Sequence, residues 1–269
     1  MSGLDGNGLR NRVDGGCALV TGSTDGLGLA IATRLARGGR DVMLHGLEPE
    51  AAVRPLADAL GASHGVRVAY VRSDLSTEEG VRQLADAALA MGEVGVLVNN
   101  AVVRDSRPVT ELSGASWQRS LAVNLTAPLR LIQQLLPGMR ARGWGRIVNM
   151  ASIYGVRAAV NRVDYVTTKS ALLGLTRAVA LETSGQGITC NAACPGTVLT
   201  PGIDARIEAI VAQGVARAEA ERRYLTGKQP TGRFVAADDV AELVAFLCTP
   251  AAKDITGAML PMDGGWMAS

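Results

Sequence analysis

The sequence TGSTDGLG, at residues 21–28, stands between the apolar run CALV and a segment of helical length at residues 27–37. Glycine permits a tight turn and lets backbone amides approach a pyrophosphate at the N-terminus of the helix that follows. The chain contains 32 glycines, so a glycine-rich stretch alone carries little weight. Its position between a strand and a helix predicts a dinucleotide-binding turn, with contacts at Gly22, Thr24, Asp25, Gly26, Leu27 and Gly28.

Short apolar runs alternate with helix-length segments along the rest of the chain. The runs show little polar–apolar alternation, which is typical of parallel strands buried on both faces: 17–22, 41–45, 66–72, 94–100, 145–152, 187–195 and 258–262. The expected helices lie at residues 27–37, 49–61, 77–91, 116–142, 163–184 and 237–248. This alternation predicts an α/β fold with one Rossmann-type doubly wound parallel sheet and helices on both faces.

The domain organisation follows from composition along the chain. Residues 1–15 are rich in Gly, Asn and Asp, which predicts a flexible N-terminal extension. Residues 16–269 contain no linker, repeat or low-complexity tract, so we expect a single domain. A polar segment rich in Ala, Arg and Glu, at residues 202–225, predicts a helical substrate flap near residues 197–228.

Composition excludes several classes of protein. Hydrophobic residues make up 48% of the 269 residues and charged residues 19%, which supports a large core and excludes wholesale disorder. The chain has 27 basic and 25 acidic residues and only 3% aromatic residues, so we expect no nucleic-acid partner. The four cysteines form no C-x-x-C pair and there are only two histidines, so we expect reduced thiols and no metal site.

The same inventory bears on location. No apolar run approaches the roughly 18 residues that a membrane helix needs. The residues before Cys17 include no apolar stretch like that of a secretory signal peptide. We therefore expect a cytoplasmic enzyme with a small-molecule substrate and no membrane partner.

Tyr165 and Lys169 are four residues apart, so they project from one face of the expected helix. A tyrosine with a pKa near 10 is a poor base at neutral pH, and an adjacent ammonium favours its phenolate. Only three of the 27 basic residues are lysines, which makes this one informative. A surface pair is the ordinary interpretation of Tyr–Lys alone, but Ser152 and Asn124 favour a catalytic group. Asn124 lies in an apolar helical stretch, where a buried amide without a hydrogen bond costs about 1–3 kcal/mol. Its presence there indicates a kink in the helix, a role in the site, or both.

The glycine spacing TGxxxGxG resembles that of the short-chain dehydrogenase/reductase family, and the other motifs agree. NNAV at residues 99–102 stands where the family has NNAG, and Ser152 precedes Tyr165 by thirteen residues. YVTTK at residues 165–169 and CPGTVLT at residues 194–200 match two further family motifs. The resemblance extends from the first strand to the C-terminus.

This resemblance implies a role for each catalytic candidate. Tyr165 would take the hydroxyl proton as hydride leaves for nicotinamide. Lys169 would lower the pKa of the tyrosine and bond the nicotinamide ribose, Ser152 would hold the substrate oxygen, and Asn124 would position a water that links Lys169 to solvent. Further cofactor contacts are expected at Asp74, Leu75, Asn100, Tyr165, Lys169, Pro195, Gly196 and Val198.

Two of these positions leave questions open. Asp74 either bonds the adenine amino group or caps the helix that follows, and its spacing favours neither interpretation. Val102 replaces the glycine of NNAG and places a β-branched side chain where the backbone of family members approaches the cofactor.

The choice of cofactor depends on charges near the second strand. Family members that use NADP carry a basic residue in the glycine turn or just after this strand. Here the turn holds Asp25, the strand ends in LHGLEPE at residues 44–50, and no Arg or Lys occurs between Arg40 and Arg54. The aspartate that binds the ribose diol in NAD enzymes is missing as well. We expect NAD, with NADP the less favoured alternative.

Three segments look closest to bacterial D-3-hydroxybutyrate dehydrogenases: LHGLEPE, ALETSGQGITCNAACPG at residues 180–196, and the C-terminal tail from residue 227. That group binds the substrate carboxylate with glutamine, histidine and lysine side chains, whereas the matching positions here are Arg104, Tyr154, Arg162 and Arg206, so the likeness does not extend to the pocket. Arginine suits bidentate recognition of anions. We therefore expect a small anionic hydroxy acid such as 3-hydroxybutyrate, or a bulkier anionic relative.

The sequence is also compatible with other functions. Within the family, the alternatives are a 3-oxoacyl-carrier-protein reductase and a sugar or polyol dehydrogenase. A non-catalytic dinucleotide-binding regulator is a different class, and the presence of both Tyr165 and Lys169 argues against it. The apolar stretches LRLIQQLL (residues 129–136) and ALLGLTRAVAL (residues 171–181) exceed what one sheet face buries, so we expect a homotetramer with two-fold axes, as the resemblance implies.

Overall fold

The computed structural model describes residues 16–269, and the extension expected at residues 1–15 lies outside them. A single seven-stranded sheet with the order β3-β2-β1-β4-β5-β6-β7 runs through the described residues, and every pair of neighbours is parallel. The strands are β1 (Cys17–Val20), β2 (Val42–Gly46), β3 (Val68–Arg72), β4 (Val94–Asn99), β5 (Gly145–Met150), β6 (Ile188–Pro195) and β7 (Met259–Met262). The predicted doubly wound sheet is confirmed.

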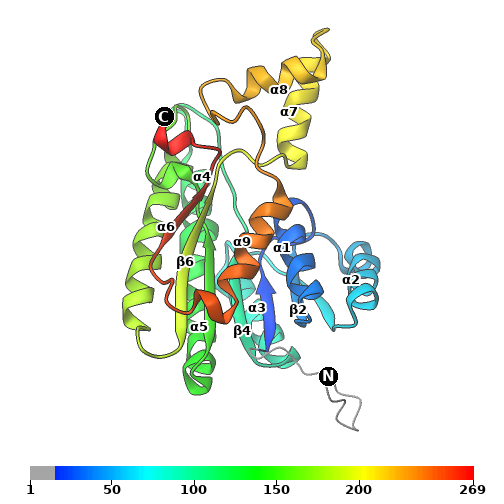
Figure 1. Ribbon diagram of the computed structural model, residues 1–269, viewed down its shortest axis with the longest axis vertical. Coiled ribbons are helices and arrows are strands. Elements are labelled where there is room, and N and C mark those ends of the chain that lie inside the picture. The colour runs from blue at the N-terminus through cyan, green and yellow to red at the C-terminus, as the bar shows by residue number, and fades with distance from the viewer. Residues whose placement is uncertain (1–15) are drawn as a thin grey trace.

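Helices cover both faces of this sheet (Figure 1). They are α1 (Gly26–Arg37), α2 (Glu50–His64), α3 (Glu78–Met91), α4 (Gly114–Leu121), α5 (Ala127–Arg142), α6 (Val163–Glu182), α7 (Pro201–Val211), α8 (Arg217–Leu225) and α9 (Ala237–Leu247). Short turns of helix occur at η2 (Ile153–Gly155), η3 (Pro250–Ala252) and η4 (Trp266–Ala268). None of the described helices is long and apolar enough to cross a membrane.

Residues of β1 alternate between two hydrophobic cores, which shows how the sheet is buried on both sides. Ala18 and Val20 join the core formed with α1, α2 and α9, whereas Cys17 and Leu19 join the core formed with α3, α5 and α6. All four residues are essentially inaccessible to solvent. A strand without a polar face is stable only between two layers of helices, as the apolar runs indicated.

The segment expected to form one helix at residues 116–142 contains three elements. Between α4 and α5 lies the π-helical turn η1 (Ala122–Thr126), which contains Asn124. In this wider turn, the side-chain amide of Asn124 forms hydrogen bonds with Val103 and Thr168, which lie outside its own helix. A π-turn inside a helix is often found at functional sites.

The carboxyl ends of all strands meet at one edge, and the chain reverses direction in the sheet order between β1 and β4. The expected flap forms two helices, α7 and α8, which project beyond this edge (Figure 1). They have a small core of their own around Ile203, Ile207 and Ala220, which Tyr224 and Phe234 cover. We call the segment from residue 201 to residue 228 the lid.

Candidate active site

One cavity of about 540 Å³ runs along the carboxyl edge of the sheet and under the lid. It brings together every predicted cofactor and substrate residue, together with Ser152, Tyr165 and Lys169. Asn124 is the exception, because it is buried behind the lining. The sequence analysis did not predict several other charged or aromatic lining residues: His45, Glu48, Arg119, Tyr224, Lys228 and Trp266.

The glycine turn after β1 is shaped by close backbone contacts. Gly22 has a φ of 59°, and a Cβ on it would lie 2.9 Å from the Cα of Ala101. A Cβ on Gly28 would lie 2.0 Å from the carbonyl oxygen of Gly22, so α1 begins directly against the turn. Asn100 donates its side-chain amide to the carbonyl oxygens of Thr21 (3.0 Å) and Gly22 (2.8 Å). The close backbone contacts therefore require glycine at positions 22 and 28.

The start of α1 fits the pyrophosphate of a dinucleotide. The first amide that bonds back toward the helix start is that of Leu29, which donates to the carbonyl of Asp25 at 3.0 Å. The amides of Gly26, Leu27 and Gly28 therefore precede the hydrogen-bonded ladder, and these residues line the cavity. The side chain of Asp25 does not cap the helix. Free amides at a helix N-terminus bind anionic oxygens.

Asp74 does not cap α3, which answers one of the two questions left open by the sequence. Thr77 is the N-cap, because its hydroxyl accepts a hydrogen bond from the amide of Gly80 at 3.0 Å. Asp74 instead accepts from the amide of Ser76 at 2.9 Å, and this bond is the main cause that lowers the pKa of its carboxyl. Its carboxylate lines the cavity, so contact with an adenine remains a prediction.

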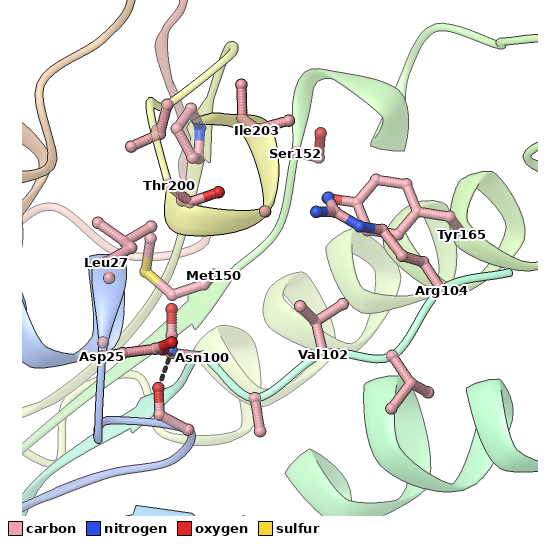
Figure 2. Close-up of a pocket in the computed structure, with 18 of the residues that line it drawn as sticks. Asp25, Leu27, Asn100, Val102, Arg104, Met150, Ser152, Tyr165, Thr200 and Ile203 are labelled. Atoms are coloured by element: carbon pink, nitrogen blue, oxygen red, sulfur yellow. Dashed lines mark hydrogen bonds between the residues drawn. The ribbon is translucent and has the colours of Figure 1, made fainter. Parts of the chain in front are cut away.

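Ser152, Tyr165 and Lys169 are positioned by β5, η2 and α6. Ser152 follows β5, and its hydroxyl accepts the amide of Tyr154 at 3.2 Å. Tyr165 lies in the first turn of α6, and Lys169 lies one turn later, with its ammonium nitrogen 5.6 Å from the centre of the Tyr165 ring. Lys169 Nζ donates to the carbonyl oxygen of Met150 at 2.6 Å. Figure 2 shows Ser152, Tyr165 and Arg104 around one part of the cavity.

Burial and nearby charges shift the pKa values of these groups in opposite directions. Burial raises the pKa of Tyr165, whereas a hydrogen bond with Ser152 and the charges of Arg104 and Arg162 lower it. Burial, with a smaller contribution from the charge of Arg104, lowers the pKa of Lys169 to about 8. The charges of Arg104 and Arg162 therefore add to the influence that the sequence analysis expected from Lys169. Lys169 Nζ lies 5.6 Å from the centre of the Tyr165 ring, and its own effect on the phenolate remains a prediction.

Asn124 holds the loop after β4. Its side-chain oxygen accepts the amide of Val103 at 2.9 Å, and its nitrogen donates to the carbonyl of Val103 (2.8 Å) and to the hydroxyl of Thr168 (3.2 Å). The buried amide is therefore paired at both ends, which removes the cost of burying it. Its proposed part in a proton route through water remains a prediction.

Val102, which replaces a family glycine, lines the cavity and is 42% exposed. Among the described residues, the only non-glycine residue with a positive φ is Asn161. The backbone at position 102 therefore needs no glycine conformation, and the valine side chain is accommodated within the cavity wall. Figure 2 shows it between Asn100 and Arg104 along the same loop.

The end of the cavity that contains the predicted substrate residues is aromatic and basic. The Tyr154 ring lies edge-on to Tyr165 and to Trp266, with ring centres 6.2 Å and 5.6 Å apart. Lys228 Nζ lies 3.6 Å from the centre of the Tyr224 ring, the second Tyr-x-x-x-Lys pair in this chain. That repeated spacing in a chain with three lysines was the signal in the sequence for Lys228.

A dinucleotide turn at one end of a cavity, with a tyrosine, a serine and a lysine farther along, is the arrangement of a Rossmann-type oxidoreductase that works with a nicotinamide dinucleotide. A family model described as enoyl-(acyl carrier protein) reductase matches residues 22–267. The chain belongs to the short-chain dehydrogenase/reductase family, so the predicted family is confirmed.

Individual relatives differ in what they act on. A D-beta-hydroxybutyrate dehydrogenase of Cupriavidus necator is 37% identical over 258 residues, which cover 95% of this chain and 99% of that protein. A 3-oxoacyl-(acyl-carrier-protein) reductase of Aquifex aeolicus is 33% identical and covers 94% of this chain and 98% of that protein. The crystal structure of L-sorbose reductase from Gluconobacter frateurii, complexed with NADPH and L-sorbose, has a TM-score of 0.90 at 31% identity and covers 96% of this chain and 98% of that one.

Proposed function

We propose that this protein interconverts a secondary alcohol and a ketone on a small anionic hydroxy acid, such as 3-hydroxybutyrate or a bulkier anionic relative, with NAD(H). The observation that carries the proposal is the position of Arg104 and Arg162. Both line the cavity close enough to Tyr165 to lower its pKa. Neither forms an ion pair with an acidic side chain in residues 16–269.

The acids closest in sequence to these arginines have other partners. Asp105 binds Arg107 at 3.0 Å, and its amide donates to the carboxylate of Asp164 at 3.0 Å. Asp164 also accepts the hydroxyl of Ser120 at 2.7 Å. Guanidinium groups that face a cavity without a partner suit a carboxylate supplied by the substrate.

The mechanism assigns a task to each side chain. Bound NAD supplies the hydride acceptor, held by the glycine turn, by the end of β6 and by the residues around Lys169. The phenolate of Tyr165 accepts the hydroxyl proton, and Ser152 donates a hydrogen bond to the substrate oxygen. Arg104 and Arg162 hold the carboxylate and favour the phenolate. The ammonium of Lys169, with a pKa of about 8, exchanges its proton near neutral pH.

NAD is proposed over NADP because of the charges at the nucleotide end. The basic residues of the cavity lining are Arg104, Arg119, Arg162, Lys169, Arg206 and Lys228. All of these basic residues follow β4 in the chain. The charged residues that β1, β2, β3 and the turns after them contribute to the lining are all acids: Asp25, Glu48 and Asp74. A 2′-phosphate near these acids would be repelled.

Two relatives favour alternatives within the same family. The Aquifex aeolicus protein is a carrier-protein reductase, and the structure of L-sorbose reductase contains NADPH and a neutral sugar. A neutral sugar makes no use of unpaired guanidinium groups, so the basic end of the cavity favours the hydroxy acid.

The direct test is a screen of hydroxy acids and neutral polyols with NAD and with NADP, in which the absorbance of the reduced cofactor measures turnover. We expect turnover of hydroxy acids with NAD. Tyr165→Phe should lower kcat by at least about 100-fold and leave NADH binding nearly unchanged, since it removes only the proton acceptor. Turnover confined to polyols, or a Tyr165→Phe variant as active as the parent protein, would overturn the proposal.

A specificity variant refines the screen. Arg162→Met should raise KM for an anionic substrate by about tenfold or more, the order expected for a charge-assisted hydrogen bond. Arg107→Met is the matched control, because Arg107 is exposed and paired with Asp105. Equal effects of Arg162→Met on anionic and neutral alcohols would contradict the role of Arg162.

A further inference from the structure

The charged residues of the cavity are separated by sign along the sheet. The acids Asp25, Glu48 and Asp74 follow β1, β2 and β3. The cations beyond β4, apart from Lys169 on α6 and Arg119 on α4, form a basic group at the opposite end: Arg104, Arg162, Arg206 and Lys228. The chain after β4 contributes no acidic residue to the lining of the cavity. A single carboxylate would leave most of this positive charge without a counter-charge.

The four cations occupy two levels. Arg104 and Arg162 line the cavity together with Tyr165, and Arg162 immediately precedes α6, whose first turn contains Tyr165. Lys228 and Arg206 belong to the lid. Burial is the main cause that lowers the pKa of Lys228, and the charges of Arg162 and Arg206 lower it as well. Arg162 is thus three residues before Tyr165 in the chain and lines the same cavity as the two cations of the lid. A ligand that reaches from Tyr165 to the lid would meet both levels.

Every carboxylate of the lid is already bound by another arginine. Arg217 binds Asp204, Glu208 and Glu221, and thereby joins α7 to α8. Glu219 binds Arg222 and Arg223. These four are the only acids at residues 201–228. The lid is thus held together by its own ion pairs, and Arg206 and Lys228 remain without an acidic partner among the described residues.

Lys228 is held in place although its charge is unpaired. Its ammonium lies 3.6 Å from the centre of the Tyr224 ring, and Tyr224 packs against Phe234 with ring centres 6.2 Å apart. The side chain is half-buried and has no hydrogen-bond acceptor within residues 16–269. Contact with a ring face stabilises an ammonium and leaves N–H groups free to bind a ligand.

We propose that the substrate carries a second anionic group, which Arg206 and Lys228 bind on the lid, while Arg104 and Arg162 bind the first anionic group beside Tyr165. This proposal rests on the proposed function and narrows its substrate to a dianionic hydroxy acid. In the reaction, the C–H bond of the carbinol carbon would break with transfer of hydride to NAD, the O–H bond would break with transfer of the proton to Tyr165, and a C=O bond would form. The products are the oxo dianion, NADH and one proton.

A matched pair of substrates tests this. 3-Hydroxyadipate and 3-hydroxyhexanoate have the same six-carbon chain and differ only in the second carboxylate. We expect kcat/KM with NAD to favour 3-hydroxyadipate by at least about tenfold, the effect of one charge-assisted pair. The preference should shrink as salt is added, since both lid cations are partly exposed.

Variants assign the preference to the lid. Lys228→Met and Arg206→Met should each bring the ratio of the two kcat/KM values close to one, and Lys228→Arg, which keeps the charge, should restore it. Lys253→Met is the matched control, because Lys253 is exposed and paired with Asp254. Arg222→Met is the control on the lid itself, because its partner Glu219 keeps Arg223. Both controls should retain the full preference.

Binding of unreactive diacids separates the two proposals. The protein loaded with NADH is titrated with adipate and with hexanoate by calorimetry, which needs no turnover. Tighter binding of adipate that Lys228→Met abolishes supports the second anionic site, even if no hydroxy acid is oxidised and the proposed function fails. Equal binding of the two acids, an equal turnover of the matched substrates, or a preference that survives both lid variants would overturn the second site.

Discussion

The imidazole Nδ1 of His45 accepts a hydrogen bond of 3.0 Å from the backbone amide of Gly22, the first glycine of the dinucleotide turn. The other ring nitrogen, Nε2, lies 3.0 Å from the carbonyl oxygen of Ser73, so it carries the proton and the ring is neutral. Burial lowers the pKa of this imidazole, while Glu48 and Asp74 act in the opposite direction. A second proton on Nδ1 would oppose the Gly22 amide.

The first prediction is that acid weakens cofactor binding through His45. Its pKa in the folded protein lies below the ordinary value of 6.5, so the unfolded chain binds more protons as the pH falls below that value. Stability should therefore decrease from about pH 6.5 downward, and affinity for NADH should decrease at lower pH, where the folded imidazole itself takes up a proton. NADH fluorescence titrations and melting curves between about pH 5.5 and about pH 7.5 measure both.

Two variants isolate the imidazole. His45→Asn places an oxygen as many bonds from the backbone as Nδ1, so it keeps an acceptor for Gly22 that does not titrate. We expect a flatter pH dependence in this variant, whereas His64→Asn, at the only other histidine, should behave like the parent protein. An unchanged slope in His45→Asn would show that another group causes the pH dependence.

The sequence predicted what is encoded locally. The order of strands and helices, the glycine turn and the Tyr165–Lys169 pair all depend on spacings of a few residues, and the structure has each of them. The two apolar faces of β1 are likewise visible in four consecutive residues.

What the sequence did not predict depends on partners distant along the chain. The π-turn at Asn124 is associated with hydrogen bonds to Val103, twenty-one residues away. His45 contacts Gly22 and Ser73 only once β1, β2 and β3 are adjacent. The role proposed for Lys228 depends on the lid acids being bound to other arginines, which no local spacing predicts.

The second prediction concerns the choice between NAD and NADP. A Cβ on Gly46 would lie 2.2 Å from a carboxylate oxygen of Glu48, so this acid folds against the end of β2. The hydroxyl of Tyr70 donates to the Glu48 carbonyl at 2.7 Å and fixes the turn. We expect a higher kcat/KM with NAD, and a smaller NAD preference in Asp25→Lys and in Glu48→Gln because repulsion of a 2′-phosphate is relieved.

The control for this comparison is Glu50→Gln, at an exposed residue paired with Arg54. It should leave the ratio of the two kcat/KM values unchanged. Equal use of both cofactors by the parent protein would contradict the interpretation of these acids.

The third prediction is the assembly state. Leu129 on α5 and Leu181 on α6 are 37% and 79% exposed in the single chain, although both helices contribute to the same core. Large exposed apolar side chains on long helices favour burial against a second copy. We expect a homotetramer by sedimentation velocity at micromolar concentration, and smaller species for Leu181→Glu. Leu89→Glu on α3, at an exposed leucine outside these helices, is the control. A monomeric parent protein would contradict this prediction.

The last prediction concerns the pH dependence of alcohol oxidation. Oxidation needs the phenolate of Tyr165, so kcat should rise with pH toward the pKa of this residue, which burial raises and Arg104 lowers. Arg104→Met removes a positive charge that favours the phenolate, so the profile should move to higher pH by about half a unit to one unit, a small shift because Arg104 is exposed. Arg104→Lys keeps the charge and should restore the profile, and Arg107→Met on the same loop should leave it in place.

The measurement is kcat at saturating hydroxy acid and NAD across the alkaline range. A merely structural role for Arg104 would lower kcat at every pH without moving the midpoint, and that result would contradict the influence of Arg104 on Tyr165.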